Sequence, residues 1–140
     1  MELYSTTIVT NTNGVFSALG GKTRFRNSVL QNPGYLNCDG DGSAHISDDS
    51  RNFSTDNSCP LPISQTGLGL DPQLGPLTAD IPGSVFFYHM PLTGSPLIDA
   101  GHNCPTRDQR GANRVGPCDI GAVEYAGLAW RSLLPIVVKQ

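Results

Sequence analysis

Thr7-Ile-Val-Thr-Asn11 is followed later in the chain by Ser28-Val-Leu-Gln-Asn32, and a glycine comes soon after each segment, at Gly14 and Gly34. The two segments share one pattern at an offset of about 21 residues, a length typical of one coil in a solenoid of parallel strands. Each coil of such a solenoid contributes short strands that lie against the matching strands of the next coil. The repeat therefore favours a parallel β-solenoid.

The residues around the repeat predict further short strands. We expect strands over Val15–Leu19 and over Thr23–Leu30, and in the second of these Phe25, Asn27 and Val29 alternate with polar residues. That alternation places the three side chains on one face of a single strand.

Four later segments also have strand character: His45–Ile46, Asn52–Ser54, Ser84–Met90 and Ala122–Tyr125. Ser84–Met90 is the strongest of them because it is rich in aromatic and β-branched residues. No segment of ten or more residues shows the periodicity of an amphipathic helix. The predicted fold class is therefore all-β.

The four cysteines allow three pairings into two disulfides. We favour Cys38–Cys59 and Cys104–Cys118, because the members of each pair are close in sequence and enclose a loop rich in turn residues. Structural disulfides indicate an oxidising compartment, so we expect a secreted or cell-surface protein.

Charge and apolar patterning exclude several classes of partner. The net charge is -3 and the basic residues are scattered, which argues against binding of nucleic acid. The apolar run Leu133–Val138 is too short to span a membrane.

The N-terminal residues lack the pattern of an export signal, and with the disulfides this favours part of a longer secreted chain.

A family resemblance rests on an ordered set of motifs. In chain order these are Asn27-Ser-Val-Leu30, Asn37-Cys38, Ser58-Cys59, Asp71-Pro-Gln-Leu-Gly-Pro76, Pro91-Leu-Thr-Gly-Ser-Pro-Leu-Ile-Asp-Ala-Gly101, Asp108-Gln-Arg-Gly111 and Cys118-Asp-Ile-Gly-Ala-Val-Glu124. Together they resemble the C-terminal region of bacterial choice-of-anchor surface proteins. The resemblance implies the end of a right-handed parallel β-helix of the pectin-lyase-like type, with a loop-rich cap pinned by the disulfides.

Within that resemblance, residues 1–127 form end coils and cap, with coils over about 1–57 and the cap over about 58–127, and residues 128–140 form a tail. The cap is expected to cover the open end of the coils, where unpaired strand edges would otherwise be exposed. The expected role is structural and adhesin-like, with upstream coils of a longer chain and a surface polysaccharide or protein as partners. The exposed first coil at Leu3–Thr10 predicts self-association of the isolated chain.

Charged residues of the closing segment are candidate structural groups. They are Asp99, Asp108, Arg110, Asp119 and Glu124. We expect Arg110 to pair with a nearby carboxylate and hold the cap together. The alternative is a carbohydrate-active site, a lyase or hydrolase, in which acidic groups and arginine converge in an open groove. No catalytic or cofactor-binding residue is predicted.

Two other segments carry residues suited to a metal or a ligand. Asp39 and Asp41 lie in an Asp-Gly-Asp-Gly run that offers oxygen ligands to calcium, although the remaining ligands of a complete calcium loop are missing. This leaves a calcium-stabilised binding module as a second alternative. His89 directly follows the aromatic residues Phe86–Tyr88 in the same predicted strand, and we expect a hydrogen-bonded strand histidine there. Those aromatic residues and Trp130 would pack, or stack on sugar rings.

Overall fold

The computed structural model describes residues 1–40, 51–61, 67–80 and 85–126, together with the backbone of 45–47. The strands are β1 (Glu2–Tyr4), β2 (Thr7–Val9), β3 (Val15–Ser17), β4 (Thr23–Arg26), β5 (Val29–Gln31), β6 (Cys38–Gly40), β7 (His45–Ser47), β8 (Phe53–Ser54), β9 (Leu74–Thr78) and β10 (Tyr88–Pro91). No helix occurs in the residues that are described, and the predicted all-β class is confirmed. The tail at 128–140 lies outside them.

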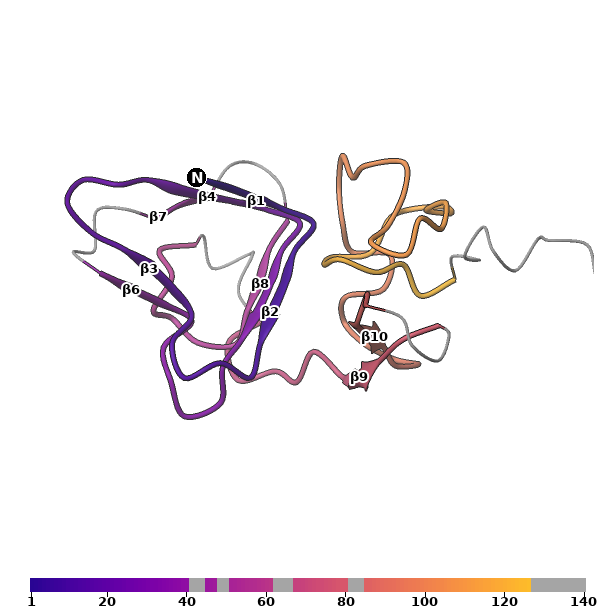
Figure 1. Ribbon diagram of the computed structural model, residues 1–140, viewed down its shortest axis with the longest axis horizontal. Helices are drawn as coiled ribbons and strands as arrows, with labels where there is room; N and C mark the ends of the chain where they lie inside the picture. Colours follow the sequence, from indigo (N-terminus) through magenta and orange to yellow (C-terminus); the bar gives the residue numbers. More distant parts are fainter. Residues whose placement is uncertain (41–44, 48–50, 62–66, 81–84, 127–140) are drawn as a thin grey trace, which may run out of the picture.

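The first eight strands pair in parallel in three small sheets. The sheets have the orders β1–β4–β7, β2–β5–β8 and β3–β6, so each later strand lies beside the matching strand of the preceding pass of the chain. Figure 1 shows the three sheets as the three sides of a triangle, with successive passes superimposed in the view. Parallel pairing follows because each pass returns to the same side in the same direction.

Apolar side chains form rows across the passes inside the triangle. Leu3 pairs with Phe25, and Ile8 pairs with Leu30. Phe25 and Leu30 have no exposed surface, and the other two pack against the same cluster. Burial of these rows is the main favourable contribution to folding of the three parallel sheets.

The register corrects the predicted repeat by one residue. The sequence pattern aligns Thr7 with Ser28, whereas the structure pairs Thr7 with Val29. The observed register pairs Ile8 with Leu30, and both side chains lie in the interior. A shift of one residue would pair Ile8 with a residue whose side chain points to the opposite face of the sheet. The predicted spacing holds at the following corner, where the Asn11 N–H donates to Asn32 Oδ1 across 21 residues.

A corner at Asn27 divides the predicted strand Thr23–Leu30 into two. Asn27 has φ of 46°, a left-handed conformation that asparagine adopts more readily than most residues. The chain turns there from β4 into β5, so the alternation predicted across Asn27 is wrong. Phe25 belongs to the interior cluster, but Val29 belongs to a second cluster outside it.

After β8, β9 pairs with β10 in the antiparallel direction. The predicted strand Ser84–Met90 is shorter in the structure, where β10 begins at Tyr88, and Ser84 lies outside the described residues. The strand Leu74–Thr78 was not predicted, because its Gly75 and Pro76 are typical of turns. The predicted strand Ala122–Tyr125 is wrong, since those residues form turns and irregular backbone.

Residues 95–126, here called the lateral segment, pack against the outer face of the β2–β5–β8 sheet (Figure 1). Leu97 and Ile120 form an apolar cluster with Val29 and Phe53. These contacts are made to the outer face of a sheet, and the expected covering of an open end stays a prediction. Val29 and Phe53 make the outer face of this sheet apolar, and packing of Leu97 and Ile120 removes that surface from water.

Hydrogen bonds join the lateral segment to two different passes. The Gly121 N–H donates to the Asn27 carbonyl at 2.7 Å, and the Ala122 N–H donates to Thr7 Oγ1 at 3.0 Å. At Gly121 φ is +107°, and an added Cβ would lie only 2.9 Å from Thr7 Oγ1, so a side chain there would force a shift. Glycine therefore permits the close approach of the two backbones.

The disulfides are Cys38–Cys59 and Cys104–Cys118, the two pairs favoured from the sequence. The first joins β6 to the segment after β8, and the second closes a loop within the lateral segment. No free cysteine remains. None of the residues described forms a helix long and apolar enough to cross a membrane.

Candidate functional site

Buried charge is concentrated in the lateral segment. Asp108, Asp119 and Glu124 are all at most 8% exposed. A buried carboxylate is costly unless it is paired or hydrogen-bonded, so the partners of these three groups decide whether they are available for chemistry.

Asp108 is fully engaged by groups of its own loop and of Glu124. Its Oδ1 accepts hydrogen bonds from the backbone N–H groups of Arg110 and Ala112, at 2.8 and 2.9 Å. Its Oδ2 accepts from Arg110 Nε at 2.9 Å and from the Glu124 N–H at 3.0 Å. The predicted ion pair of Arg110 is present, with Nη2 2.9 Å from Asp108 Oδ2.

Arg110 also connects the lateral segment to β10. Its Nη2 donates to the Glu124 carbonyl at 2.6 Å, and its guanidinium carbon lies 5.4 Å from the centre of the Tyr88 ring. The Tyr88 hydroxyl in turn donates to Asp80 Oδ1 at 2.5 Å. Burial raises the pKa of Tyr88, and the hydrogen bond and charge of Asp80 raise it further.

Arg114 pairs with Glu124, and this role was missed in the sequence. Arg114 Nη1 lies 3.0 Å from Glu124 Oε2, with both side chains at most 4% exposed. Arg114 also donates to the carbonyls of Asp119 and Gly121, at 3.3 and 2.8 Å. The only available signal was the run of arginines that includes Arg107, Arg110 and Arg114, which does not by itself identify a partner.

Among the residues described, no basic side chain pairs with Asp119, and backbone donors hold its carboxylate. Its Oδ1 accepts from the Asp99 N–H at 2.8 Å and its Oδ2 from the Tyr125 N–H at 2.5 Å. Burial raises the pKa of Asp119, and the nearby charges of Glu124 and Asp99 also raise it, while the two backbone donors lower it. Asp99 contributes its backbone here, because its own side chain is exposed.

The other predicted candidates have simpler surroundings. His89 Nδ1 is 2.8 Å from the Gly75 carbonyl, a contact between β10 and β9, as expected for a hydrogen-bonded strand histidine. Asp39 Oδ1 accepts from the Gly40 N–H at 2.7 Å, and Asp41 lies outside the described residues. Within the parts of the chain that are described, no three His, Cys, Asp or Glu side chains are grouped to hold a metal ion.

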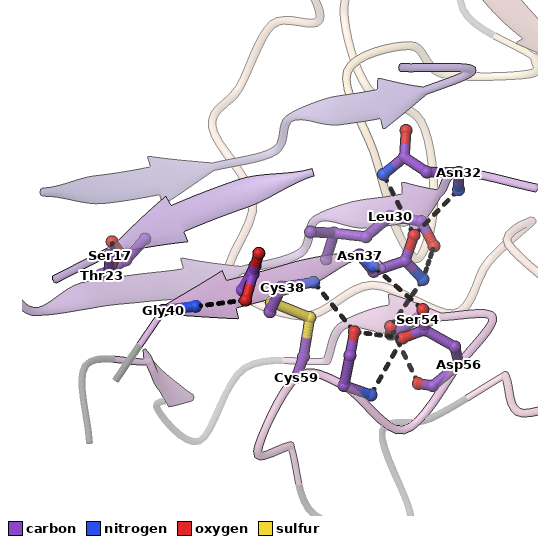
Figure 2. Close-up of a disulfide and its surroundings, with 12 residues drawn as sticks. Ser17, Thr23, Leu30, Asn32, Asn37, Cys38, Gly40, Ser54, Asp56 and Cys59 are labelled. Carbon is purple, nitrogen blue, oxygen red and sulfur yellow. Dashed lines mark hydrogen bonds between the residues drawn. A yellow bond between two sulfur atoms is a disulfide. The ribbon is translucent and has the colours of Figure 1, made fainter. Parts of the chain in front are cut away.

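Polar side chains surround the Cys38–Cys59 disulfide (Figure 2). Asn37 donates from Nδ2 to the Leu30 carbonyl and to Ser54 Oγ, both at 3.0 Å, and its Oδ1 accepts from the Asn32 N–H. Its own N–H donates to Asp56 Oδ2 at 2.9 Å. These bonds satisfy the buried backbone at the corner after β5, so the cluster is structural.

Comparisons with protein-family models, with curated proteins and with solved structures found no match for this chain.

Proposed function

We propose that this chain is the structural C-terminal part of a secreted or surface-displayed right-handed parallel β-helix, similar to choice-of-anchor surface proteins, with an adhesive and non-catalytic role. The observation that carries the proposal is the parallel register of successive passes, in which Leu3 pairs with Phe25 and Ile8 with Leu30. Contacts such as Thr6 N–H to Ser28 Oγ recur across 22 residues, a length suited to one coil. The two disulfides support an extracellular setting.

The state of the charged groups favours a structural role over a carbohydrate-active site. Catalytic carboxylates need access to substrate, and one of them needs a free proton or lone pair. Asp108 and Glu124 instead pair with Arg110 and Arg114 below the surface. A buried pair of this kind fixes the conformation of the loops that carry it.

An adhesive surface is supported by apolar side chains beside the β9–β10 pair. Val85, Phe86 and Phe87 are 80%, 69% and 52% exposed, and Leu77 on β9 is 60% exposed. Clustered exposed apolar side chains are typical of interaction surfaces. The aromatic rings suit stacking on a polysaccharide or packing on a protein.

The coil architecture is tested by an engineered disulfide between exposed residues that are opposite one another. Phe16 on β3 pairs with Asp39 on β6. Neighbouring strands lie about 4.8 Å apart, within the range that a disulfide spans. We expect F16C/D39C to form this bridge on mild oxidation, as mapped by peptide mass spectrometry. The control F16C/R24C joins different sheets and should not form it; equal bridging in both variants would refute the register.

The adhesive role is tested with immobilised acidic and neutral polysaccharides and extracellular proteins. We expect the chain to bind at least one coat, and F86S/F87S to weaken that binding about tenfold or more. L19S removes an exposed leucine on another surface and serves as the control. Absence of binding to every coat would contradict the role. Release of reducing ends or unsaturated sugars would instead establish the enzymatic alternative.

The same proposal includes self-association through the first coil. β1, β2 and β3 each pair on one side only among the strands described, so their other edges present backbone groups for pairing. We expect concentration-dependent growth in light scattering, suppressed by Val9→Lys, which places a charge on β2 outside the interior rows. A monomer at all accessible concentrations would contradict this part of the proposal.

A further inference from the structure

Three basic side chains lie in a row on the outer face of β4. Thr23 and Phe25 are 2% and 0% exposed, so their side chains point to the interior. Because successive side chains of a strand alternate between its two faces, Lys22, Arg24 and Arg26 point outward. Lys22 and Arg24 are exposed, and Arg26 is half-buried. These three residues are here called the basic row.

Backbone pairing keeps the basic row extended from end to end. The Met1 nitrogen donates to the Lys22 carbonyl at 2.7 Å, and the Arg24 N–H donates to the Met1 carbonyl at 3.0 Å. The ladder between the first two passes therefore includes Lys22. Alternate residues of such a strand lie about 6.8 Å apart, so the row is about 14 Å long. β4 lies between β1 and β7 on one side of the triangle (Figure 1).

The basic row carries more positive charge than its neighbours neutralise. Glu2 on β1 is paired in register with Arg24, and its Oε1 lies 3.6 Å from Arg26 Nη1. The side chains of this ion pair are 34% and 53% exposed, and exposed pairs interact weakly. No ion pair joins Lys22 or Arg24 to a carboxylate of the residues described. Two cations of the row are thus available to a partner.

This positive face is a local feature of an acidic chain. The net charge is -3, with nine basic residues in all. Arg110 and Arg114 are used in buried ion pairs of the lateral segment. The overall charge does not attract polyanions, so a polyanion would bind where cations are adjacent and exposed.

We propose that the outer face of β4 binds a sulfated linear polysaccharide, with Lys22 and Arg24 as the main contacts. Ammonium and guanidinium groups form strong charge-assisted hydrogen bonds with oxyanions. A polymer with more than one sulfate per sugar presents closely spaced anions, so that a row of cations along one strand contacts several of them. Arg26 lies beside these contacts, and its guanidinium carbon is 5.1 Å from the centre of the Tyr4 ring.

Two observations favour a polysaccharide over a nucleic acid. Proteins that bind duplex DNA commonly neutralise about six to ten phosphates, more than this row provides. The two disulfides also favour an extracellular setting. The inference goes beyond the proposed adhesive surface, because Phe86 and Phe87 lie beside the β9–β10 pair and not on the sheet that carries the row.

The test is binding of the complete chain to immobilised heparin, neutral dextran and duplex DNA, measured by surface plasmon resonance between 50 and 200 mM sodium chloride. We expect saturable binding to heparin, weaker binding to DNA and none to dextran. Release of counterions at three contacts predicts that affinity for heparin falls about 20-fold or more over this salt range. Absence of saturable heparin binding at the lowest salt, or equal affinity for DNA, overturns the proposal.

Two arginine substitutions with the same change of charge locate the site. Arg24→Gln should weaken heparin binding about tenfold and reduce the slope of log affinity against log salt by about one. Arg107→Gln changes an exposed arginine of the lateral segment and should leave both quantities unchanged. Arg24→Lys keeps the charge and should retain most of the affinity. Equal losses in R24Q and R107Q would assign the binding to nonspecific attraction and overturn the site.

A carboxylate substitution tests the same face in the opposite direction. Glu2→Gln removes the acidic neighbour of the row and should strengthen heparin binding about two- to threefold. Asp71→Asn makes the same change of charge at an exposed position elsewhere and should have no effect. Equal affinities of E2Q and D71N would show that heparin does not contact the row.

The aromatic variant distinguishes this inference from the adhesive role. F86S/F87S should bind heparin as the wild type does, while its binding to another coat is weakened. Loss of heparin binding in F86S/F87S, with R24Q unaffected, would move the heparin site to the aromatic surface and overturn the inference.

Discussion

Val29 and Leu30 are neighbours in β5 and both are completely buried, yet they belong to different apolar clusters. Successive side chains of a strand point to opposite faces, so Leu30 lies inside the coils and Val29 lies beneath the lateral segment. The strand is thus buried on both faces. The lateral segment therefore covers one face of β5, just as the neighbouring sheets cover the other.

Truncation of a leucine in each cluster should have separable effects. Leu97→Ala removes the centre of the outer cluster and should cost about 2–5 kcal/mol of unfolding free energy, as should Leu30→Ala in the interior. We expect L97A to sensitise the lateral segment to limited proteolysis before the coils unfold. The exposed Leu92→Ala is the control. Simultaneous cleavage of coils and lateral segment in L97A would show a single cooperative unit instead.

Alanine substitutions at two glycines should separate the cost of backbone strain from the cost of steric overlap with neighbouring side chains. Gly116 and Gly121 both have positive φ, but only Gly121 faces neighbouring atoms, with Thr7 Oγ1 and Val29 Cγ2 at 2.9 and 3.1 Å from an added Cβ. Gly116→Ala should cost about 1 kcal/mol through backbone strain alone. Gly121→Ala should cost about 1–3 kcal/mol more through overpacking. Chemical denaturation measures both, and equal costs would refute the close approach.

The corner hydrogen bonds of Asn27 can be removed without adding backbone strain. Asn27→Gly keeps the left-handed conformation accessible and deletes two bonds to the His102 backbone. We expect a loss of about 1–3 kcal/mol and faster amide exchange at His102. Asn103, whose carbonyl accepts from the Tyr4 hydroxyl, provides an internal reference. Unchanged exchange at His102 would contradict the assigned contact.

The pKa of Asp119 predicts a pH dependence of stability. Burial raises this pKa in the folded state, so the folded chain holds the proton more tightly than the unfolded chain. The resulting contribution to stability is present at acidic pH and is lost as pH rises through the raised pKa. Asp119→Asn removes it, so the stability of the wild type relative to D119N should fall as pH rises from about 4.

The control for this titration is Asp71→Asn, which changes an exposed aspartate outside the cluster. Its stability relative to the wild type should show no matching trend across the same pH range. A constant difference between wild type and D119N would refute the raised pKa.

The two disulfides should contribute comparably. They enclose separations of 21 and 14 residues, for which restriction of the unfolded chain predicts about 3 kcal/mol each. C38A/C59A and C104A/C118A should each lower the melting temperature, and only the second pair should increase amide exchange around Asp119. Thermal melts with and without reductant provide the measurement. Equal exchange in both variants would contradict a local role for Cys104–Cys118.

The sequence was informative where a contact is local or repeats along the chain. The strand segments at Val15 and Phe53, the disulfide pairs and the Arg110–Asp108 pair follow from nearby residues or from alternation. The corner at Asn27 was not predictable from alternation, because a single left-handed residue reverses which side chains point inward.

Long-range packing was beyond such patterns. The Ala122 N–H binds Thr7 Oγ1 across 115 residues, and no repeat or alternation in the sequence relates these two positions. Arg114 lies in a buried pair with Glu124 ten residues away, on an irregular loop where spacing indicates no common face.

The lateral segment also constrains the order of folding. Pairing between passes joins residues about one coil apart, such as Thr6 and Ser28 at a separation of 22, whereas Ala122 reaches Thr7 across 115 residues. Contacts of such high sequence separation are slow to form and cannot begin until both ends have been synthesised. During synthesis the outer face of β2 and β5 therefore stays uncovered until the lateral segment has been made. Only then can Ala122 bind Thr7 and the segment pack on this face.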